Sequence, residues 1–277
     1  MFVDTHCHLD LIARLDDEKK PLSDADYVII DRALHEAVQA DVGAFINIGT
    51  SIAGSIQSVE LAQRYANVYA SIGIHPCDCG TGSTNELKQR MQSLQLLLKD
   101  KESNKIVAIG EIGLDFFHKP YDKQAQIDFF KAQIELALRY DLPIVIHVRD
   151  AADELLRVVE EYVKDKLRGV FHCFLQKKDF ADIILDWGFY VGLDAPITYP
   201  KNESLRNVFK DIPLERILLE TDAPFLPLQQ YRGQQNRPVY IPLIAEALAN
   251  IKGIDVATVE TVTTANAQKL FVFMQQV

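Results

Sequence analysis

The sequence predicts a single (β/α)8 barrel over residues 1–277. Three observations lead to this prediction: eight short apolar runs, longer amphipathic stretches between them, and a length near the roughly 250 residues of a typical barrel. The apolar runs are continuous rather than alternating, which is typical of parallel strands buried on both faces. A doubly wound open sheet is the alternative, but no Gly-rich phosphate-binding motif follows the first run.

Each element can be placed in order. The expected strands are rich in Val, Ile, Phe and Tyr and cover residues 2–6, 44–49, 68–75, 105–113, 143–148, 169–174, 189–193 and 216–221. Between 124 and 141, apolar residues such as Ile127, Phe130 and Ile134 recur at helical spacing, and residues 255–274 repeat the pattern after Gly253 ends the preceding helix. Residues 80–104 are expected to form a helix with loops.

Composition limits the functional classes. The net charge of −10 argues against a protein that coats nucleic acid with a basic surface, but not against an enzyme that binds a few phosphates through metal ions. Four cysteines, of which Cys77 and Cys79 are too close for an ordinary disulfide, favour a reducing compartment. The sequence has neither a secretory signal pattern nor an apolar run of about 18 residues, so we expect a cytoplasmic, soluble protein with no membrane partner.

Metal-ligating residue types stand at the ends of several expected strands. His6 and His8, in "DTHCHLD", are two residues apart and would project from one face of a strand, although an isolated pair is a weak signal. The C-terminal ends of barrel strands converge on one mouth, where six such residues would meet without partners unless metal ions satisfied them. The sequence therefore predicts a metal site built from His6, His8, Glu111, His147, His172 and Asp222.

These residues lie in motifs that also carry a family resemblance. The segments "DTHCHLD", "GIHP", "GEIGLDF", "LPIVIHVRD", "GVFHCF", "LLETDAPFL" and "RGQQNRP", with the Gln126-x-x-x-Phe130-x-x-Gln133 spacing, cover nearly the whole chain. Together they resemble the TatD family of metal-dependent deoxyribonucleases. The resemblance implies an amidohydrolase-like barrel, two divalent ions, and hydrolysis of phosphodiester bonds in DNA from the 3′ end.

The resemblance also implies roles for the ligands. His6 and His8 match the first-strand ligands, Glu111 the ligand that bridges both ions, and His147 and His172 the ligands of strands five and six. Asp222 matches the eighth-strand carboxylate that serves as ligand and base, so Asp222 and Glu111 are the expected catalytic residues.

The chemistry fits these residue types. Two divalent ions held by these residues would clamp a phosphate and supply a metal-activated hydroxide, and Asp222 would orient the water and take its proton. Mg, Mn, Zn, Co and Ni all remain open as the metal.

The contacts with substrate are expected from a second set of residues, each with a structural alternative. His75 faces the substrate phosphate or orients a ligand, and Arg149 clamps a phosphate or pairs with Asp115 or Asp153. In the loop after strand eight, Arg232 and Asn236 contact phosphate or sugar, or belong to a structural hairpin.

Three further features stay open. Asp115 either holds the second nitrogen of a ligand histidine or caps the following turn. Phe116 and Phe117 either stack on bases or pack in the core. The cysteines are expected to be bystanders, but Cys77 replaces the polar residue usual in the family after "HP", which leaves a third metal-binding role open.

Two other functional classes compete with the nuclease. One is a hydrolase of small esters, lactones or amides on the same barrel, but such relatives commonly bridge their metals with a modified lysine where this chain has Glu111. The other is a non-catalytic metal-binding interaction protein, which the complete ligand set argues against. We expect DNA as a weakly bound substrate, with RNA open and no obligate protein partner.

Overall fold

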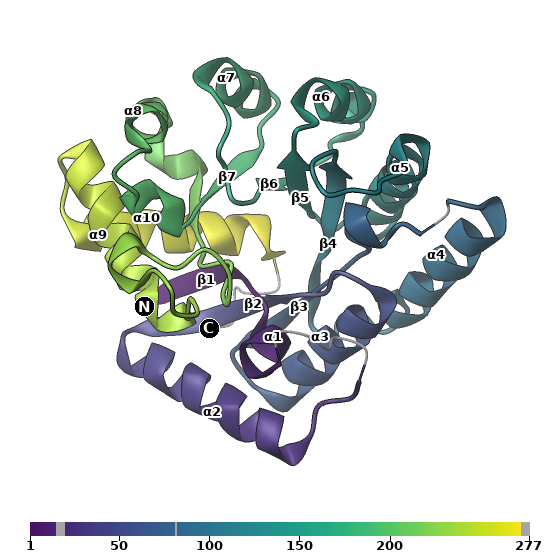
Figure 1. Ribbon diagram of the computed structural model, residues 1–277, viewed down its shortest axis with the longest axis horizontal. Coiled ribbons are helices and arrows are strands. Elements are labelled where there is room, and N and C mark those ends of the chain that lie inside the picture. Colours follow the sequence, from purple (N-terminus) through teal and green to yellow (C-terminus); the bar gives the residue numbers. More distant parts are fainter. Residues whose placement is uncertain (15–19, 81, 273–277) are drawn as a thin grey trace. The chain divides into compact units, whose positions relative to one another are not determined.

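The computed structural model describes residues 1–14, 20–80 and 82–272. Strands alternate with helices along the chain, and the strands follow one another in a single sheet in the order β1 to β8 (Figure 1). The pairs β1–β2, β3–β4, β4–β5, β5–β6 and β7–β8 are parallel. This is the (β/α)8 barrel class, which confirms the predicted fold.

The eight expected strands are all present, with ends that differ by a few residues. They are β1 Phe2–Cys7, β2 Val42–Ile48, β3 Val68–Ile72, β4 Ile106–Asp115, β5 Ile144–Arg149, β6 Gly169–Phe171, β7 Tyr190–Leu193 and β8 Ile217–Leu219. The α-helices are α1 Leu9–Ala13, α2 Asp24–Gln39, α3 Ile52–Arg64, α4 Thr84–Leu98, α5 Lys123–Tyr140, α6 Ala152–Glu160, α7 Lys178–Asp186, α8 Glu203–Asp211, α9 Ile241–Lys252 and α10 Val256–Leu270.

Local sequence explains where these helices begin and end. Asp122 caps the N-terminus of α5 by accepting a hydrogen bond from the backbone N–H of Ala125 at 3.0 Å. Gly253 ends α9 in the left-handed conformation, at φ +67°, as predicted. Helix α10 covers most of the predicted 255–274 pattern, of which residues 273 and 274 lie outside the described residues.

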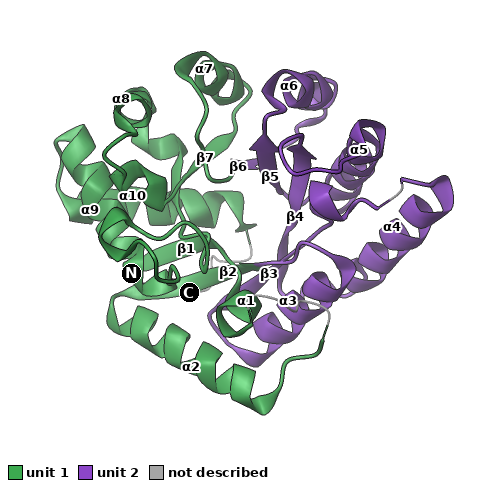
Figure 2. Ribbon diagram, in the orientation of Figure 1, with its two compact units in different colours: residues 1–47, 172–277 green, residues 48–171 purple. Residues whose placement is uncertain are grey.

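Two compact units divide the chain (Figure 2). Unit 1 comprises residues 1–47 and 172–277, and unit 2 comprises residues 48–171. In unit 1, α10 packs on β1 and β8, and in unit 2, α3 packs on β3 and α5 on β4. A single domain over residues 1–277 stays a prediction.

The strands are buried as their continuous hydrophobicity predicts. Every residue of β1, β3, β4, β6, β7 and β8 is buried. The buried residues include His6 of β1 and Glu111 of β4, two of the predicted ligands. No helix in the described part of the chain is long and apolar enough to cross a membrane.

Candidate active site

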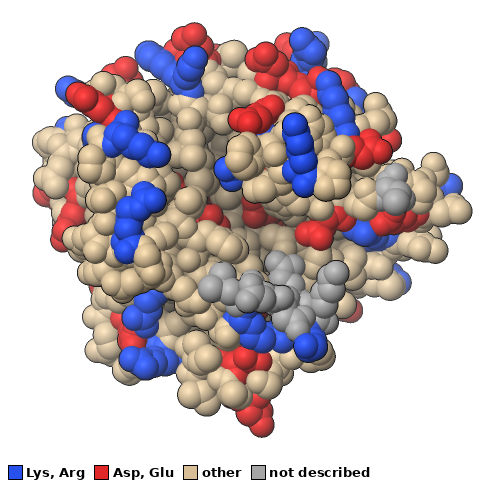
Figure 3. Space-filling model, viewed as in Figure 1, with Lys and Arg blue, Asp and Glu red and all other residues tan. Residues whose placement is uncertain are grey.

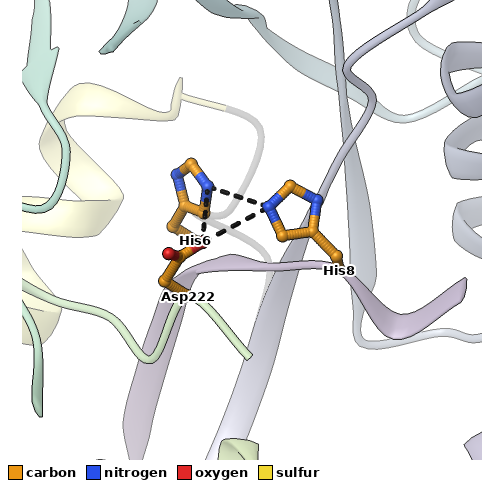
Figure 4. Close-up of side chains that lie close together, drawn as sticks. All are labelled: His6, His8 and Asp222. Atoms are coloured by element: carbon orange, nitrogen blue, oxygen red, sulfur yellow. Dashed lines mark hydrogen bonds and ion pairs between the residues drawn. The ribbon is translucent and has the colours of Figure 1, made fainter. Parts of the chain in front are cut away.

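In unit 1, three predicted ligands come together at the ends of β1 and β8. The Nε2 atoms of His6 and His8 lie 3.3 Å apart, and Oδ1 of Asp222 lies 3.5 Å from the first and 3.4 Å from the second (Figure 4). All three residues are buried. Their three donor atoms therefore face one point, as ligands of one ion would.

Backbone contacts fix this arrangement. The N–H of Asp222 donates to the carbonyl of His6 at 2.8 Å, and the N–H of His8 donates to the carbonyl of Ala223 at 2.7 Å. Asp222 itself has φ +55°, which turns the chain at the end of β8. The segment after β8 is thus bound to the end of β1, although the two are far apart in sequence.

His172 joins the same cluster from the end of β6. Its ring stacks on that of His6, with centroids 4.1 Å apart and planes 13° from parallel. On its other side, Nδ1 lies 3.8 Å from Oε1 of Glu220. At this separation the two groups are near neighbours but are too far apart for a hydrogen bond.

The charge state of Asp222 suits a ligand or a base. Burial raises the pKa of this carboxyl, but the hydrogen bond from His8 and the nearby imidazoles of His6 and His172 outweigh burial, and the pKa lies below its ordinary value. Asp222 is therefore a carboxylate at neutral pH.

Three buried carboxyl groups that were not predicted from the sequence lie beside these predicted ligands. Asp4 accepts hydrogen bonds from the N–H of His6 at 3.3 Å and from the N–H and hydroxyl of Thr221 at 3.0 and 2.6 Å. Burial raises its pKa to about 7, against the effect of the Thr221 hydrogen bonds. Asp4 thus links the backbone of His6, a predicted ligand, to the backbone of Thr221, which directly precedes the predicted ligand Asp222.

Glu220 and Asp194 are the other two. Oε1 of Glu220 accepts a hydrogen bond from the N–H of Cys173 at 2.5 Å, next to His172. Burial, followed by the nearby Asp194, raises the pKa of Glu220 well above its ordinary value. The signal that would have found Asp4 and Glu220 is the strand period of two, because each precedes a predicted ligand by two residues.

In unit 2, the predicted ligands Glu111 and His147 form a second cluster with His75. Oε1 of Glu111 lies 2.8 Å from Nδ1 of His147 and 3.5 Å from Nε2 of His75. Glu111 is 4% exposed. Three potential ligand atoms are again within reach of one ion.

Asp115 fills both roles that were left open for it. Its Oδ2 lies 3.0 Å from Nε2 of His147, so it holds the second nitrogen of a predicted ligand. Its Oδ1 accepts hydrogen bonds from the N–H groups of Phe117 and His118, both at 2.9 Å, and so caps the turn. These hydrogen bonds outweigh burial and lower the pKa of Asp115 below its ordinary value.

His147 is positively charged when no metal is present. Burial alone would lower its pKa, but the hydrogen bonds with Asp115 and Glu111 raise the pKa to about 9. A proton on this ring occupies the place where a metal would bind.

The predicted substrate contacts differ in placement. The Arg149 guanidinium is exposed and lies 3.9 Å from the centroid of the Phe117 ring, and no ion pair of Arg149 occurs among the described residues. Exposed Arg232 lies over Tyr199 at 5.0 Å. Among the residues that the structure describes, both guanidinium groups lie over aromatic rings and neither pairs with a carboxylate.

Asn236 is fully buried. Its amide donates to the carbonyl of Thr221 at 2.6 Å and to that of Leu226 at 3.3 Å, so it shapes the loop after β8. This placement favours the structural alternative over a contact with substrate.

Two clusters of imidazole and carboxylate groups at the strand ends of a (β/α)8 barrel define the class of metal-dependent hydrolases. The comparisons place the chain within that class. The family model described as TatD related DNase matches residues 3–272, and the chain belongs to this family of hydrolytic enzymes. The predicted family and the predicted enzyme class, a hydrolase, are confirmed.

Relatives of full length support this assignment. An uncharacterized metal-dependent hydrolase of Bacillus subtilis is 31% identical over 98% of this chain and 99% of its own. A protein of Citrobacter rodentium named 3′-5′ ssDNA/RNA exonuclease TatD is 32% identical over 87% of this chain and 91% of its own. The crystal structure of a TatD homologue, YjjV of Escherichia coli, matches with a TM-score of 0.86 at 30% identity, over 98% of both chains.

Proposed function

We propose that this protein is a metal-dependent exodeoxyribonuclease that removes nucleotides from the 3′ end of DNA. In this proposal His6, His8, Glu111, His147, His172 and Asp222 together hold two divalent ions. Family membership supports the proposal, as does the relative that is named a 3′-5′ ssDNA/RNA exonuclease.

The observation that carries the proposal is the donor set of the unit 1 cluster. Two imidazole nitrogens and a carboxylate oxygen lie 3.3 to 3.5 Å apart, inside a buried region. Such a set fits Zn, Mn, Co or Ni, and its carboxylates also accept Mg. The cluster of Glu111 and His147 offers the same donor types.

When bound, the ions neutralise the charge of a phosphodiester and acidify a water molecule. The protein's own groups supply the rest. Asp222, a carboxylate within the ligand cluster, accepts the proton of the attacking water. The guanidinium groups of Arg149 and Arg232 are exposed and bind phosphate oxygens.

His75 is suited to donate a hydrogen bond to the phosphate. Its Nδ1 accepts a hydrogen bond from the N–H of Cys77 at 3.1 Å, which a protonated Nδ1 cannot do. The proton of the neutral ring is therefore on Nε2, the atom nearest Glu111. An Nε2–H group cannot ligate a metal, so this tautomer favours the predicted phosphate contact.

The test is one gel. A 5′-labelled single-stranded DNA is incubated with the protein and Mg²⁺ or Mn²⁺, beside lanes with chelator and with Glu111→Ala. A ladder that shortens from the 3′ end, and that is absent from both control lanes, supports the proposal. Intact DNA in every lane, together with turnover of lactones or esters, contradicts it and supports the small-substrate alternative. Intact DNA without turnover of lactones or esters supports the other alternative, a non-catalytic metal-binding interaction protein.

Binding of DNA should be weak. On the face drawn in Figure 3, Lys and Arg side chains are interspersed with Asp and Glu, consistent with the net charge of −10. We expect association that depends on metal and falls as salt rises.

A further inference from the structure

A third group of metal-binding atoms lies in unit 2, outside the six proposed ligands. Sγ of Cys77, a carboxylate oxygen of Asp115 and a ring nitrogen of His118 all lie within 4.8 Å of one another. Cys77 belongs to a short 3-10 helix, Pro76–Asp78, after β3, while Asp115 ends β4 and His118 lies in the loop that follows.

The oxygen of Asp115 is held toward this group. Its Oδ1 is fixed by the two backbone N–H groups of the following turn, which leaves Oδ2 at 2.8 Å from Nδ1 of His118. The position of Cys77 is likewise fixed, because its N–H donates to Nδ1 of His75 at 3.1 Å. The Asp115 carboxylate and the backbone of Cys77 are thus positioned by hydrogen bonds that involve backbone N–H groups.

Access and charge both favour a cation here. Asp115 is fully buried, whereas Cys77 is exposed and the His118 side chain is 52% exposed, so an ion reaches the group from solvent. The carboxylates of Asp115, Asp78 and Glu111 lie near the Cys77 thiol and are offset only in part by the Arg149 guanidinium. This excess of negative charge attracts a divalent cation, which displaces the thiol proton on binding.

We propose that Cys77, Asp115 and His118 form a zinc site separate from the two-ion centre. One sulfur, one nitrogen and one oxygen ligand fit a tetrahedral zinc ion that keeps its fourth position for water. A thiolate ligand selects zinc or cobalt and disfavours magnesium. The inference does not rest on the nuclease activity.

The shared carboxylate connects this site to the catalytic residues. Oδ2 of Asp115 also lies 3.0 Å from Nε2 of His147. An ion at Cys77 and His118 therefore competes with His147 for the same oxygen.

The competing explanation is a plain ion pair between His118 and Asp115, next to an uninvolved cysteine. The two explanations differ in whether sulfur binds the metal. Cobalt(II) reports this directly, because a thiolate ligand gives a charge-transfer absorption band in the near ultraviolet that nitrogen and oxygen ligands do not give.

The experiment is a titration of the protein with Co²⁺, followed by displacement with Zn²⁺. We expect the amplitude of the band at saturation to correspond to one thiolate-bound Co²⁺ per chain, and the band to vanish on addition of Zn²⁺. It should be absent in Cys77→Ser and need at least tenfold more Co²⁺ in His118→Asn. Cys79→Ser is the matched control: Cys79 is buried, its Sγ lies 3.7 Å from the carbonyl of His75, and its variant should keep the band.

Two results would overturn the inference. One is a wild-type protein without the band, and the other is a band that persists in Cys77→Ser. A third variant, Glu111→Gln, removes a ligand of the proposed two-ion centre and must keep the band, because its loss would mean that the sulfur belongs to that centre. None of these measurements involves DNA, so failure here is distinct from failure of the proposed nuclease activity.

Discussion

At the scale of single residues, the hydrogen bonds of the histidines distinguish the proposed metal ligands from the proposed phosphate contact. His6 and His8 turn their Nε2 atoms toward Asp222, whereas Nδ1 of His75 is engaged by a backbone N–H. The same residue type is thus proposed as a ligand at positions 6 and 8 and as a hydrogen-bond donor at position 75. The assignment depends on neighbours that the local sequence does not reveal.

The first prediction concerns His75. Replacing it with Ala removes one donor to the phosphate, so we expect kcat to fall about 10²-fold while bound metal is unchanged. Steady-state kinetics and metal analysis of the same samples check this. His35→Ala is the control, since His35 is exposed on α2 and should leave both quantities as in the wild type. A loss of metal in the His75 variant would show that His75 is a ligand.

A second prediction follows from the raised pKa of His147. With a pKa of about 9 in the metal-free protein, the ring is protonated at pH 7 and must lose that proton to bind metal. Below pH 9 the apparent metal affinity should therefore fall as pH falls, by about tenfold per unit for one released proton. Calorimetric titration in buffers of different ionisation enthalpy measures the release. A metal affinity that does not change between pH 7 and 9 would contradict the arrangement in which His147 lies between Asp115 and Glu111.

At the scale of elements, side-chain amides from neighbouring segments align the strand ends. Gln126 of α5 accepts a hydrogen bond from the N–H of Asp115 at 2.9 Å and donates to its carbonyl at 2.8 Å. Gln133 does the same for Ile74, at 2.7 and 3.1 Å. One helix thereby fixes the end of β4 and the segment after β3, where Asp115 and His75 lie.

Asn236 aligns the loop after β8 in the same way, which gives a third prediction. Asn236→Ala leaves the buried carbonyl of Thr221 and the half-buried carbonyl of Leu226 without this donor, and should lower the free energy of unfolding by about 1–3 kcal/mol. Urea unfolding measures the loss. Neighbouring Gln235 is exposed, and Gln235→Ala should have no effect. Unchanged stability with a raised KM would instead restore Asn236 as a substrate contact.

Gly192 of β7 provides a fourth prediction. A Cβ atom there would lie 2.3 to 2.4 Å from the carboxyl atoms of Glu220, which is itself buried beside His172. Gly192→Ala must therefore displace Glu220, and we expect a loss of about 1–3 kcal/mol from overpacking. In Gly43→Ala the three atoms nearest the new Cβ all belong to the side chain of Met1, at 3.0 to 3.2 Å. Thermal unfolding should separate the two variants, and equal melting temperatures would show that Glu220 moves freely.

At the scale of the whole molecule, buried acidic groups are concentrated among the proposed ligands. Asp4, Asp194, Glu220 and Asp222 are all buried in unit 1. Divalent ions would favour the ionised forms of these carboxyl groups, which burial otherwise disfavours in Asp4, Asp194 and Glu220, so binding and folding should be coupled.

The fifth prediction is that metal stabilises the fold. At a free metal concentration of 100 times Kd the gain is about 2.7 kcal/mol, and EDTA should reverse it. Differential scanning calorimetry with Mn²⁺, with and without EDTA, measures the shift. His8→Asn, which removes a proposed ligand, should show a smaller shift. An equal shift in this variant would mean that the stabilising ion binds elsewhere.

The fold was predictable because the pattern of a short apolar run followed by an amphipathic stretch occurs eight times along the sequence. Buried strands such as β4 are continuous apolar runs, and Gly253 marks a helix end by its conformational freedom. Ligand types were predictable where they follow such runs. Asp194 and the tautomer of His75 were not, because they depend on contacts between segments far apart in sequence. The ligand roles and substrate contacts stay predictions that the variants above test.

The pairing of Asp4 with Thr221, across 217 positions of the chain, bears on how the enzyme is made. A ribosome adds about 5–20 residues per second, so His6 and His8 are added to the chain about 10–40 seconds before Asp222 is. During synthesis the first two proposed ligands are therefore present before the third. A chain released before Asp222 is added would lack the proposed triad, so the proposed metal site would be completed only in the last quarter of synthesis.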